Sequence, residues 1–403
     1  MANVSSSNGL EKRPKLRFPG FDDPWKETTL SALFSKSTQK NADGHITNVI
    51  CNSAKLGLIP QREYFDKDIA NSDNTSGYYI IRQNDFVYNP RKSSDAPYGP
   101  ISSYKYAEDG IVSPLYLCFH AKGEINPLYY EWYFRSSAWH RYIYMSGDSG
   151  ARHDRVSIKD DTFFAMPINL PSEQEQSKIA SFLQSLDERI VAQEKLVASL
   201  KKYKRGVNNQ ILSQIDNSYN CRLGSVCEIV GGGTPDTLHA EYWGNTVEWF
   251  TPSEIGKTKY VNNSVRKLSD IGLDNSSAKL LPIGTVLLTT RATLGEMSIA
   301  KRECSTNQGF QSLIPHTDRV SSEYLYYMQI IIKPWCEKYA SGNTFREISK
   351  SALSDCIIPI PDRARQEQIV KLLSSIDMII DAAESISMSL SKIRHGLMQQ
   401  LFI

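Results

Sequence analysis

The stretch PSEQEQSKIASFLQSLDERIVAQEKLVASLKKYKRGVNNQIL (171–212) decides the fold, because it recurs as PDRARQEQIVKLLSSIDMIIDAAESISMSLSKIRHGLMQQLF (361–402). The two copies align without a gap, which places Asp187 on Asp377 and Gly206 on Gly396. A period this long indicates duplication of a whole domain together with its helix, and it lies outside the range of solenoid repeats. The sequence therefore predicts two similar modules held apart.

Each copy has the apolar pattern of a coiled-coil helix. Apolar residues recur in alternating steps of four and three, with interruptions at Gln193 and Lys204 in the first copy and at Ser387 and Arg394 in the second. The residues expected to serve helix–helix packing and partner docking are Ile179, Leu183, Leu186, Ile190, Leu200, Ile369, Leu373, Ile376, Ile380 and Leu390.

A second set of apolar residues widens each stripe. These residues are Phe182, Leu196 and Tyr203 in the first copy and Leu372, Ile386 and Ile393 in the second. A stripe wider than a two-helix seam requires indicates further contacts, either with the globular domains or with helices of another protein.

Capping signals mark where each helix begins. Ser172 with Glu175 forms a capping box, and Asp362 can cap the second helix, although Arg365 stands where the reciprocal glutamate would be.

Each helix is expected to be about 60 Å long at ~1.5 Å per residue. If the two pack antiparallel, a pseudo-two-fold axis relates the units, like the two-fold of duplex DNA. A helical hairpin that only braces two domains fits the same pattern.

The segment before each helix consists of short apolar runs broken by Gly, Pro, Asn and Ser. Strand-like runs occur at 78–88, 111–119, 283–290 and 296–300, and helical patterns at 126–137 and 321–337. The predicted fold class is α/β, with two mixed α/β domains separated by two long helices packed as an antiparallel coiled coil in a pseudo-two-fold internal repeat. The predicted segments are domain 1 at 1–170, helix 1 at 171–216, domain 2 at 217–361 and helix 2 at 362–403.

Composition places few limits on function. The 403 residues leave room for two domains, and the net charge of +2 neither requires nor excludes nucleic acid as a partner. Seven scattered cysteines without a CxxC pair favour free thiols in a reducing compartment over a disulfide framework or a zinc site. With no signal-peptide core and no apolar run of about 18 residues, we expect a cytoplasmic protein without a membrane partner.

No catalytic motif is present in the sequence. The glycine-rich stretch GGGTPDT (231–237) lacks the following GK[ST] of a phosphate-binding loop and the GxGxxG of a dinucleotide fold. VYNPRK (87–92) departs from the (Asn/Asp)-Pro-Pro-aromatic motif of amino-methyltransferases, because Arg91 follows Pro90. The histidines form no HExxH, and no Gly-x-Ser-x-Gly elbow occurs. The sequence thus favours a binding protein over an enzyme, with no metal site.

Aromatic, basic and amide side chains gather in the predicted loops. Arginine and lysine reach guanine edges in the major groove, and asparagine and glutamine pair with adenine, so these residue types suit direct readout of DNA. A solvated loop residue is the alternative at each position. The candidate DNA-binding residues are Tyr88, Asn89, Arg91, Lys92, Tyr98, Lys105, Tyr106 and Arg152 in the first half, and Thr234, Thr290, Arg291, Thr293, Asn307 and Gln308 in the second.

The order of several motifs resembles the specificity subunits of type I restriction–modification systems. These motifs are PKLRFPGFDDPW (14–25), DFVYNP, GIVSPLY, GGGTP, TTRATLGEMSIA, the NQGFQ loop and the two Pro-led helices. One departure lies in RQEQI (365–369): Arg365 precedes Gln366, where the family usually has a glutamate before that glutamine.

The resemblance implies a non-catalytic DNA-recognition subunit. The two domains would be target-recognition domains, each reading one half of a bipartite, asymmetric target in double-stranded DNA. The helices would set the spacer and dock two adenine methyltransferase subunits. The methyltransferases would bring S-adenosylmethionine, and restriction subunits would bring ATP and Mg, so this chain would bind no cofactor itself. Two alternatives stay open: a scaffold or decoy that binds methyltransferases without reading DNA, and an enzyme that acts alone.

Overall fold

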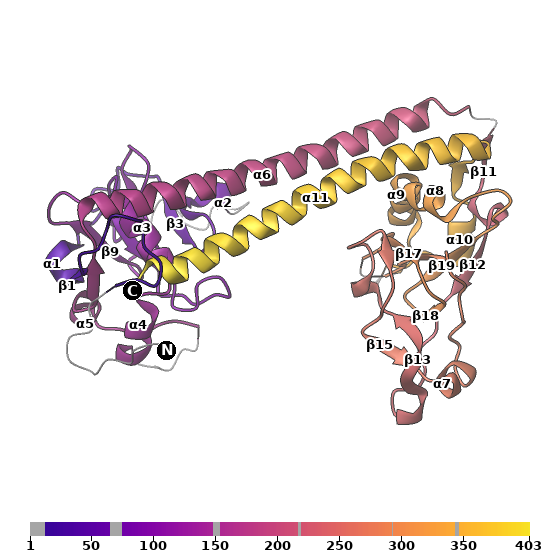
Figure 1. Ribbon diagram of the computed structural model, residues 1–403, viewed down its shortest axis with the longest axis horizontal. Coiled ribbons are helices and arrows are strands. Elements are labelled where there is room, and N and C mark those ends of the chain that lie inside the picture. Colours follow the sequence, from indigo (N-terminus) through magenta and orange to yellow (C-terminus); the bar gives the residue numbers. More distant parts are fainter. Residues whose placement is uncertain (1–12, 65–74, 148–153, 217–218, 292, 343–345) are drawn as a thin grey trace. The chain divides into compact units, whose positions relative to one another are not determined.

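The computed structural model describes residues 13–64, 75–147, 154–216, 219–291, 293–342 and 346–403. The chain forms two compact units, unit 1 from Met1–Glu194 with Ser385–Ile403, and unit 2 from Lys195–Glu384. The unit boundaries fall within the two long helices, α6 (Glu173–Ser213) and α11 (Arg363–Leu401) (Figure 1). Each unit therefore contains one mixed α/β domain and part of both helices.

Unit 1 is built on a four-stranded antiparallel sheet in the order β2–β9–β6–β7. Its strands are β2 (Phe34–Ser37), β9 (Leu117–Ala121), β6 (Phe86–Tyr88) and β7 (Ile101–Ser103). Three further antiparallel pairs are β1 (Lys26–Thr29) with β10 (Pro167–Leu170), β3 (Ile50–Ser53) with β4 (Gly57–Pro60), and β5 (Tyr79–Ile81) with β8 (Gly110–Val112). The helices are α1 (Leu30–Leu33), α2 (Gln61–Tyr64), α3 (Pro127–Arg135), α4 (His140–Ser146) and α5 (Asp160–Phe164).

Unit 2 is built on a five-stranded sheet in the order β12–β19–β16–β17–β14. Its strands are β12 (Cys227–Gly231), β19 (Gln311–Pro315), β16 (Val286–Leu288), β17 (Met297–Ala300) and β14 (Tyr260–Val261). A second sheet joins β15 (Arg266–Leu268), β13 (Trp243–Phe250) and β18 (Cys304–Thr306), and β11 (Asn220–Arg222) pairs with β20 (Ile357–Pro359). The helices are α7 (Asp270–Asp274), α8 (Ser322–Tyr327), α9 (Gln329–Tyr339) and α10 (Lys350–Ser354), with short 3-10 turns η3 (Leu223–Ser225), η4 (Ala240–Tyr242) and η5 (Pro252–Glu254).

Some predicted runs are interrupted in the structure. The run 78–88 divides into β5 and β6 because Asn84 adopts a left-handed conformation with φ of 69°. The run 111–119 divides between β8 and β9 around Pro114, since proline has no backbone N–H for a strand ladder. The helical pattern 321–337 forms two helices, α8 and α9, that meet at Met328.

The two long helices pack antiparallel within each unit. In unit 1, Ile179 and Leu183 of α6 share a core with Leu401 of α11. In unit 2, Ile211 near the end of α6 shares a core with Ile369 near the start of α11. The coiled-coil seam predicted from the sequence is therefore present in both units.

Charged residues that interrupt the predicted seam form ion pairs across it. Arg394 pairs with Asp187 in unit 1, and Lys204 pairs with Asp377 in unit 2. The alignment of the two copies places Asp187 on Asp377 and Lys204 on Arg394, so the two pairs are copies of one interaction. All four side chains are at most about one-third exposed, between 20% and 32%. An apolar partner at either aspartate would leave a partly buried carboxylate unpaired, so the pairs favour a single helix register.

The start of α6 is fixed by the N-terminal segment. Ser172 accepts a hydrogen bond from the Glu175 N–H, as the capping box predicts. The Glu175 carboxylate, however, accepts two hydrogen bonds from Arg17, from Nε at 2.7 Å and from Nη2 at 2.8 Å. At the second helix, Asp362 accepts from the Arg365 N–H at 2.9 Å. The motif PKLRFPGF therefore holds the first helix by a buried bidentate ion pair.

None of the described helices is long and apolar enough to cross a membrane. Over the same residues, no group of three or more His, Cys, Asp or Glu side chains is placed to hold a metal ion. All seven cysteines lie in described segments and are free thiols.

Replacing Arg17 by Met should destabilise the first turns of α6. Glu175 is 0% exposed in this pair, and removing one partner of a buried ion pair costs about 3–5 kcal/mol. Native-state hydrogen exchange of amides 175–183 in the full chain should show that the free energy of local opening falls by about that amount. The double variant R17M/E175L leaves no unpaired carboxylate, so it should recover most of the lost opening free energy. Arg365 is the residue of the second helix that aligns with Glu175, and its side chain is partly exposed. R365M is therefore the control, and it should change hydrogen exchange little. Unchanged exchange in R17M would refute the role of the pair.

Candidate nucleic-acid interface

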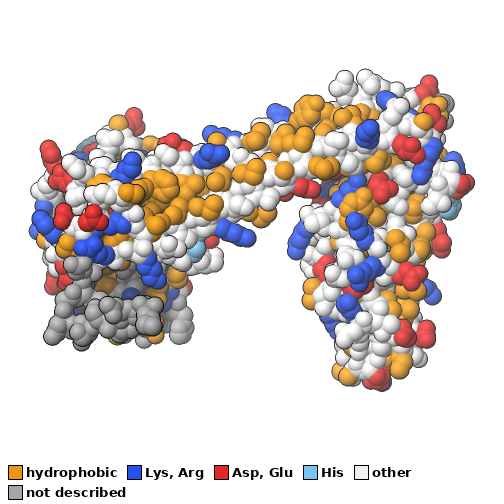
Figure 2. All heavy atoms as spheres, viewed as in Figure 1, with side chains coloured by type: hydrophobic (Ala, Val, Ile, Leu, Met, Phe, Trp, Pro, Cys, Tyr) orange, Lys and Arg blue, Asp and Glu red, His pale blue; other side chains and the backbone are white. Residues whose placement is uncertain are grey.

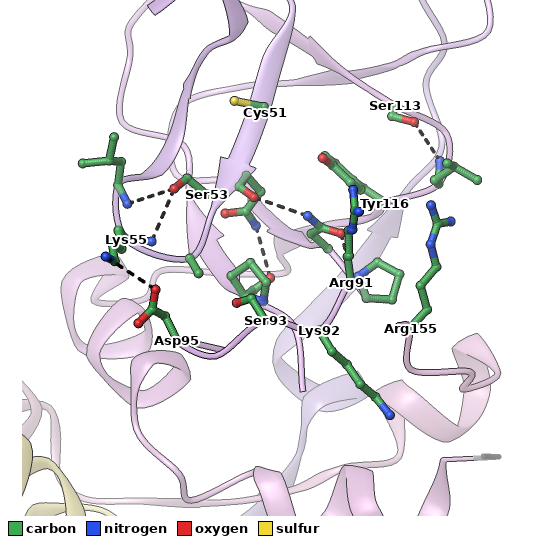
Figure 3. Close-up of a pocket in the computed structure, with 17 residues that line it drawn as sticks. Cys51, Ser53, Lys55, Arg91, Lys92, Ser93, Asp95, Ser113, Tyr116 and Arg155 are labelled. Carbon is green, nitrogen blue, oxygen red and sulfur yellow. Dashed lines mark hydrogen bonds and ion pairs between the residues drawn. The ribbon is translucent and has the colours of Figure 1, made fainter. Parts of the chain in front are cut away.

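A basic pocket of about 650 Å³ lies on unit 1 (Figure 3). Its walls are the β3–β4 hairpin, the segment that follows β6 and the loop 113–116, with Arg155 at one side. The cationic side chains that line it are Lys55, Arg91, Lys92 and Arg155, against one carboxylate, Asp95. Such an excess of positive charge in a concave surface suits a phosphate-bearing ligand.

A buried asparagine holds the walls of this pocket together. Asn52 donates to the carbonyls of Val87 at 2.7 Å and Pro100 at 3.2 Å, and accepts from the Ser102 hydroxyl at 2.8 Å. Asn89 donates to the Asn52 carbonyl at 3.3 Å. The hairpin is thus bound to β6 and β7 by side-chain hydrogen bonds, which makes the pocket a preformed feature.

Gly99 closes the turn beneath the pocket. Its φ is +82°, and a Cβ at this position would lie 2.1 Å from the Asn89 carbonyl oxygen. Any other residue would both strain the backbone and displace Asn89.

Two arginines face each other across the pocket wall. Arg91 and Arg155 form an antiparallel β-bridge, flanked by hydrogen bonds from Lys92 N to Asp154 O and from Val156 N to Pro90 O. Residues directly opposed in such a bridge project to the same side, as the two side chains do in Figure 3. Neither guanidinium has an acidic partner among the described residues, and the Nε of Arg155 is buried without a hydrogen bond there. Like charges so placed destabilise the bridge unless an anion binds them.

In unit 2, three segments named by the sequence analysis come together. The hydroxyl of Thr234 donates to the side chain of Gln308, and the Thr290 N–H donates to the Gly309 carbonyl at 2.8 Å. Thr293 donates to the Pro252 carbonyl at 3.4 Å. The glycine-rich turn, Thr290, Thr293 and the NQG loop thus lie together next to η5.

The glycines of GGGTP allow this close approach. A Cβ on Gly232 would lie 1.9 Å from the Asn307 carbonyl oxygen, and one on Gly233 would lie 2.3 Å from the Ala278 N. The crowded positions are therefore Gly232 and Gly233, whereas Gly231 lies in β12 with only ordinary contacts.

Several predicted contact residues have structural partners instead. Tyr88 is 2% exposed, stacks on Phe163, and burial raises the pKa of its hydroxyl well above the ordinary value. Thr290 is 0% exposed. Tyr88 and Thr290 were expected to touch DNA, but both side chains are buried, because β6 and the segment 285–290 are covered on both faces. Lys105 is paired at 2.9 Å with the buried carboxylate of Glu131.

The remaining candidates differ in their exposure and in whether they already have an ion-pair partner. Tyr106 is exposed beside Tyr104, whereas Tyr98 is half-buried against His140. Arg291 pairs with Glu347 at 2.9 Å, so a nucleic acid would have to compete with this carboxylate. Arg152 lies outside the described residues.

Sequence reasoning missed Lys55, Arg155 and Glu347. Arg155 comes into the pocket through the pairing of residues 90–92 with 154–156, which are far apart in the chain. Lys55 comes from the β3–β4 turn, which ends at Gly57 with a φ of +72°. No pattern in the sequence connects Glu347 with Arg291.

The predicted helix residues are mostly inside the seam. Seven of the ten, Ile179, Leu183, Ile190, Ile369, Leu373, Ile376 and Ile380, are at most 6% exposed. Leu186, Leu200 and Leu390 are half-buried. Their burial fits the predicted helix–helix packing, and their predicted part in partner docking stays a prediction.

Curated relatives match parts of the chain. It is 34% identical over 186 residues to the type I restriction enzyme MjaIX specificity subunit of Methanocaldococcus jannaschii, a match that covers 45% of this chain and 43% of that protein. It is 25% identical over 246 residues to the EcoR124I/EcoR124II specificity subunit of Escherichia coli, covering 57% and 60%. The chain thus spans about two-fifths to three-fifths of the length of these relatives.

Solved structures and a family profile extend the likeness over most of the chain. The fold is similar to a chain in a study of complex assembly and conformational transition of the type I R-M system, with a TM-score of 0.64, 19% identity, and coverage of 96% and 99%. It is also similar to the type I restriction-modification S subunit from M. genitalium, with a TM-score of 0.54, 15% identity, and coverage of 97% and 99%. The profile of the type I restriction modification DNA specificity domain matches residues 32–202 and again 216–390. The chain therefore belongs to the type I restriction–modification specificity family and carries the DNA specificity domain twice.

Proposed function

We propose that this chain is the DNA-recognition subunit of a type I restriction–modification complex and catalyses nothing itself. Each domain reads one half of a bipartite, asymmetric target in double-stranded DNA. The observation that carries the proposal is the double match to the specificity domain, in which both copies end in a helix of the same repeat.

The two surfaces described above support unlike readers. Unit 1 offers a pocket with the opposed pair Arg91 and Arg155. Unit 2 offers the surface around Thr234, Gln308 and Arg291, where the arginine is balanced by Glu347. Because different side chains line the two surfaces, the two half-targets should differ in sequence.

The long helices are proposed to set the spacer between the half-targets. The 41-residue α6 and 39-residue α11 contain no proline and are continuous across the unit boundaries. A continuous helix adds ~1.5 Å per residue. The repeated ion pairs fix the helix register in each unit, so helix length can set a defined spacing.

The outer faces of the helices are proposed to dock two adenine methyltransferase subunits. The apolar residues that widen the seam in both copies are exposed: Phe182 40%, Leu196 48%, Tyr203 61%, Leu372 48%, Ile386 50% and Ile393 52%. Hydrophobic side chains are visible along the long helices in Figure 2. Apolar residues at heptad spacing fit a helix of a partner. The methyltransferases would bring S-adenosylmethionine, and restriction subunits would bring ATP and Mg.

Replacing residues 217–361 with the same segment of another family member should change one half of the methylated motif and leave the other half intact. Co-expression with the methyltransferase subunit and long-read mapping of methylated adenines would show this. A scaffold or decoy that does not read DNA predicts no change of motif, and methylation without sequence preference in the unaltered complex would contradict the proposed function.

Inserting four residues into both helices, after Glu194 and after Glu384, should lengthen the preferred spacer. Both insertions fall at the unit boundary and leave each ion pair within its unit. Four residues add ~6 Å, close to two base-pair rises. The same adenine mapping gives the spacer, and an unchanged gap would rule out the helices as its determinant.

R155M and R91M should weaken DNA binding by the methyltransferase complex on matched and mismatched sequences alike. If each arginine holds a phosphate, the slope of log affinity against log salt should fall by about one per variant. Titrations at several salt concentrations measure this slope. Arg141, an exposed arginine of α4 that does not line the pocket, gives the control R141M. If the recognised DNA sequence changed while the salt slope did not, Arg91 and Arg155 would contact bases and not phosphates.

A further inference from the structure

We infer that the two methyltransferase docking faces are unequal, and that the face on unit 2 binds its subunit more tightly because Arg189 interrupts the face on unit 1. This inference rests on the proposed function. It concerns a set of residues that we name the outer row. The outer row consists of Phe182, Arg189, Leu196 and Tyr203 on α6 and of Leu372, Ile379, Ile386 and Ile393 on α11.

The outer row follows a single side of each helix. Its members recur once per heptad, and two helical turns bring such residues to the same face. The gapless alignment of the two copies maps every α6 member onto an α11 member. The two copies of the row are thus the same surface element, duplicated together with the domain.

Each unit takes half of its outer row from each helix. Unit 1 holds Phe182, Arg189, Ile386 and Ile393, and unit 2 holds Leu196, Tyr203, Leu372 and Ile379. Three of the four equivalent pairs are apolar on both sides. The exception is Arg189, whose counterpart Ile379 is 55% exposed.

Asp187 and Glu188 precede Arg189 in the chain, but neither forms an ion pair with its guanidinium. The side chain is exposed and makes no ion pair with any described residue. The neighbours three and four positions away along the helix are Ser185, Leu186, Ala192 and Gln193, none of which is acidic. A partner that covers Arg189 must therefore desolvate the guanidinium, supply a carboxylate for it, or leave it extended to water.

One partner chain has to fit both faces. Both faces are copies of one surface, so two copies of the same methyltransferase meet Arg189 in one unit and Ile379 in the other with the same side chains. The other three positions are apolar on both faces, which calls for an apolar partner surface. Such a surface gains from burying Ile379 and loses from covering Arg189. Assembly should then pass through a complex with one methyltransferase on unit 2.

The test measures stepwise binding of the purified methyltransferase subunit to the full chain by calorimetry and native mass spectrometry. The unaltered chain should show two dissociation constants about tenfold apart, with a one-to-one complex at limiting methyltransferase. R189I should tighten the weaker constant about tenfold and bring the two together. I379R should weaken the stronger constant by a similar factor.

The control is R205I, which adds the same apolar side chain to an exposed position of α6 outside the outer row. It should leave both constants unchanged. Two equal constants in the unaltered chain, or an R189I variant whose weaker constant does not tighten, would overturn the inference and leave the proposed function standing. Absence of any methyltransferase binding would overturn both.

Discussion

Antiparallel packing of α6 against α11 is the constraint on which the rest of the structure depends. The seam continues into the core of each domain, because Ile179 and Leu183 lie in the core of unit 1 and Ile369 and Leu373 in that of unit 2. Apolar seams tolerate slippage by whole turns, whereas a partly buried carboxylate needs its own cation. The duplicated pairs Asp187–Arg394 and Asp377–Lys204 therefore specify one register twice.

Each domain is also joined to its helices by polar contacts that differ between the units. In unit 1 the N-terminal segment supplies Arg17 to Glu175. In unit 2 the Lys259 ammonium lies 3.0 Å from the Ser374 hydroxyl and over the ring of Tyr327, and burial lowers the pKa of this lysine. The helices have kept their interface with each other and their apolar contacts to the domain cores, whereas these polar contacts to the domains have diverged. This divergence is consistent with domains that changed their recognition surfaces after duplication.

Prediction from sequence succeeded for features that depend on a repeated local pattern. It failed for side chains whose position depends on contacts with segments distant in the chain. The seam and Asp362 as a cap follow from spacing alone, because helical periodicity is local. The DNA contact predicted for Tyr88 was wrong, since β6 is buried on both faces and residue type alone does not reveal such burial. Arg155 was missed because its position depends on its pairing with Arg91, in a segment distant along the chain.

The sequence by itself determined the duplication, the paired helices and the family, because these depend on spacing along the chain. It also identified most segments that form the two candidate DNA-binding surfaces. Only the tertiary structure decided which side chains those surfaces present: Arg91 opposite Arg155, Thr234 beside Gln308, and Arg291 held by Glu347. The physical reason is that burial and pairing of loop residues are set by neighbours distant in the chain, which no local pattern encodes.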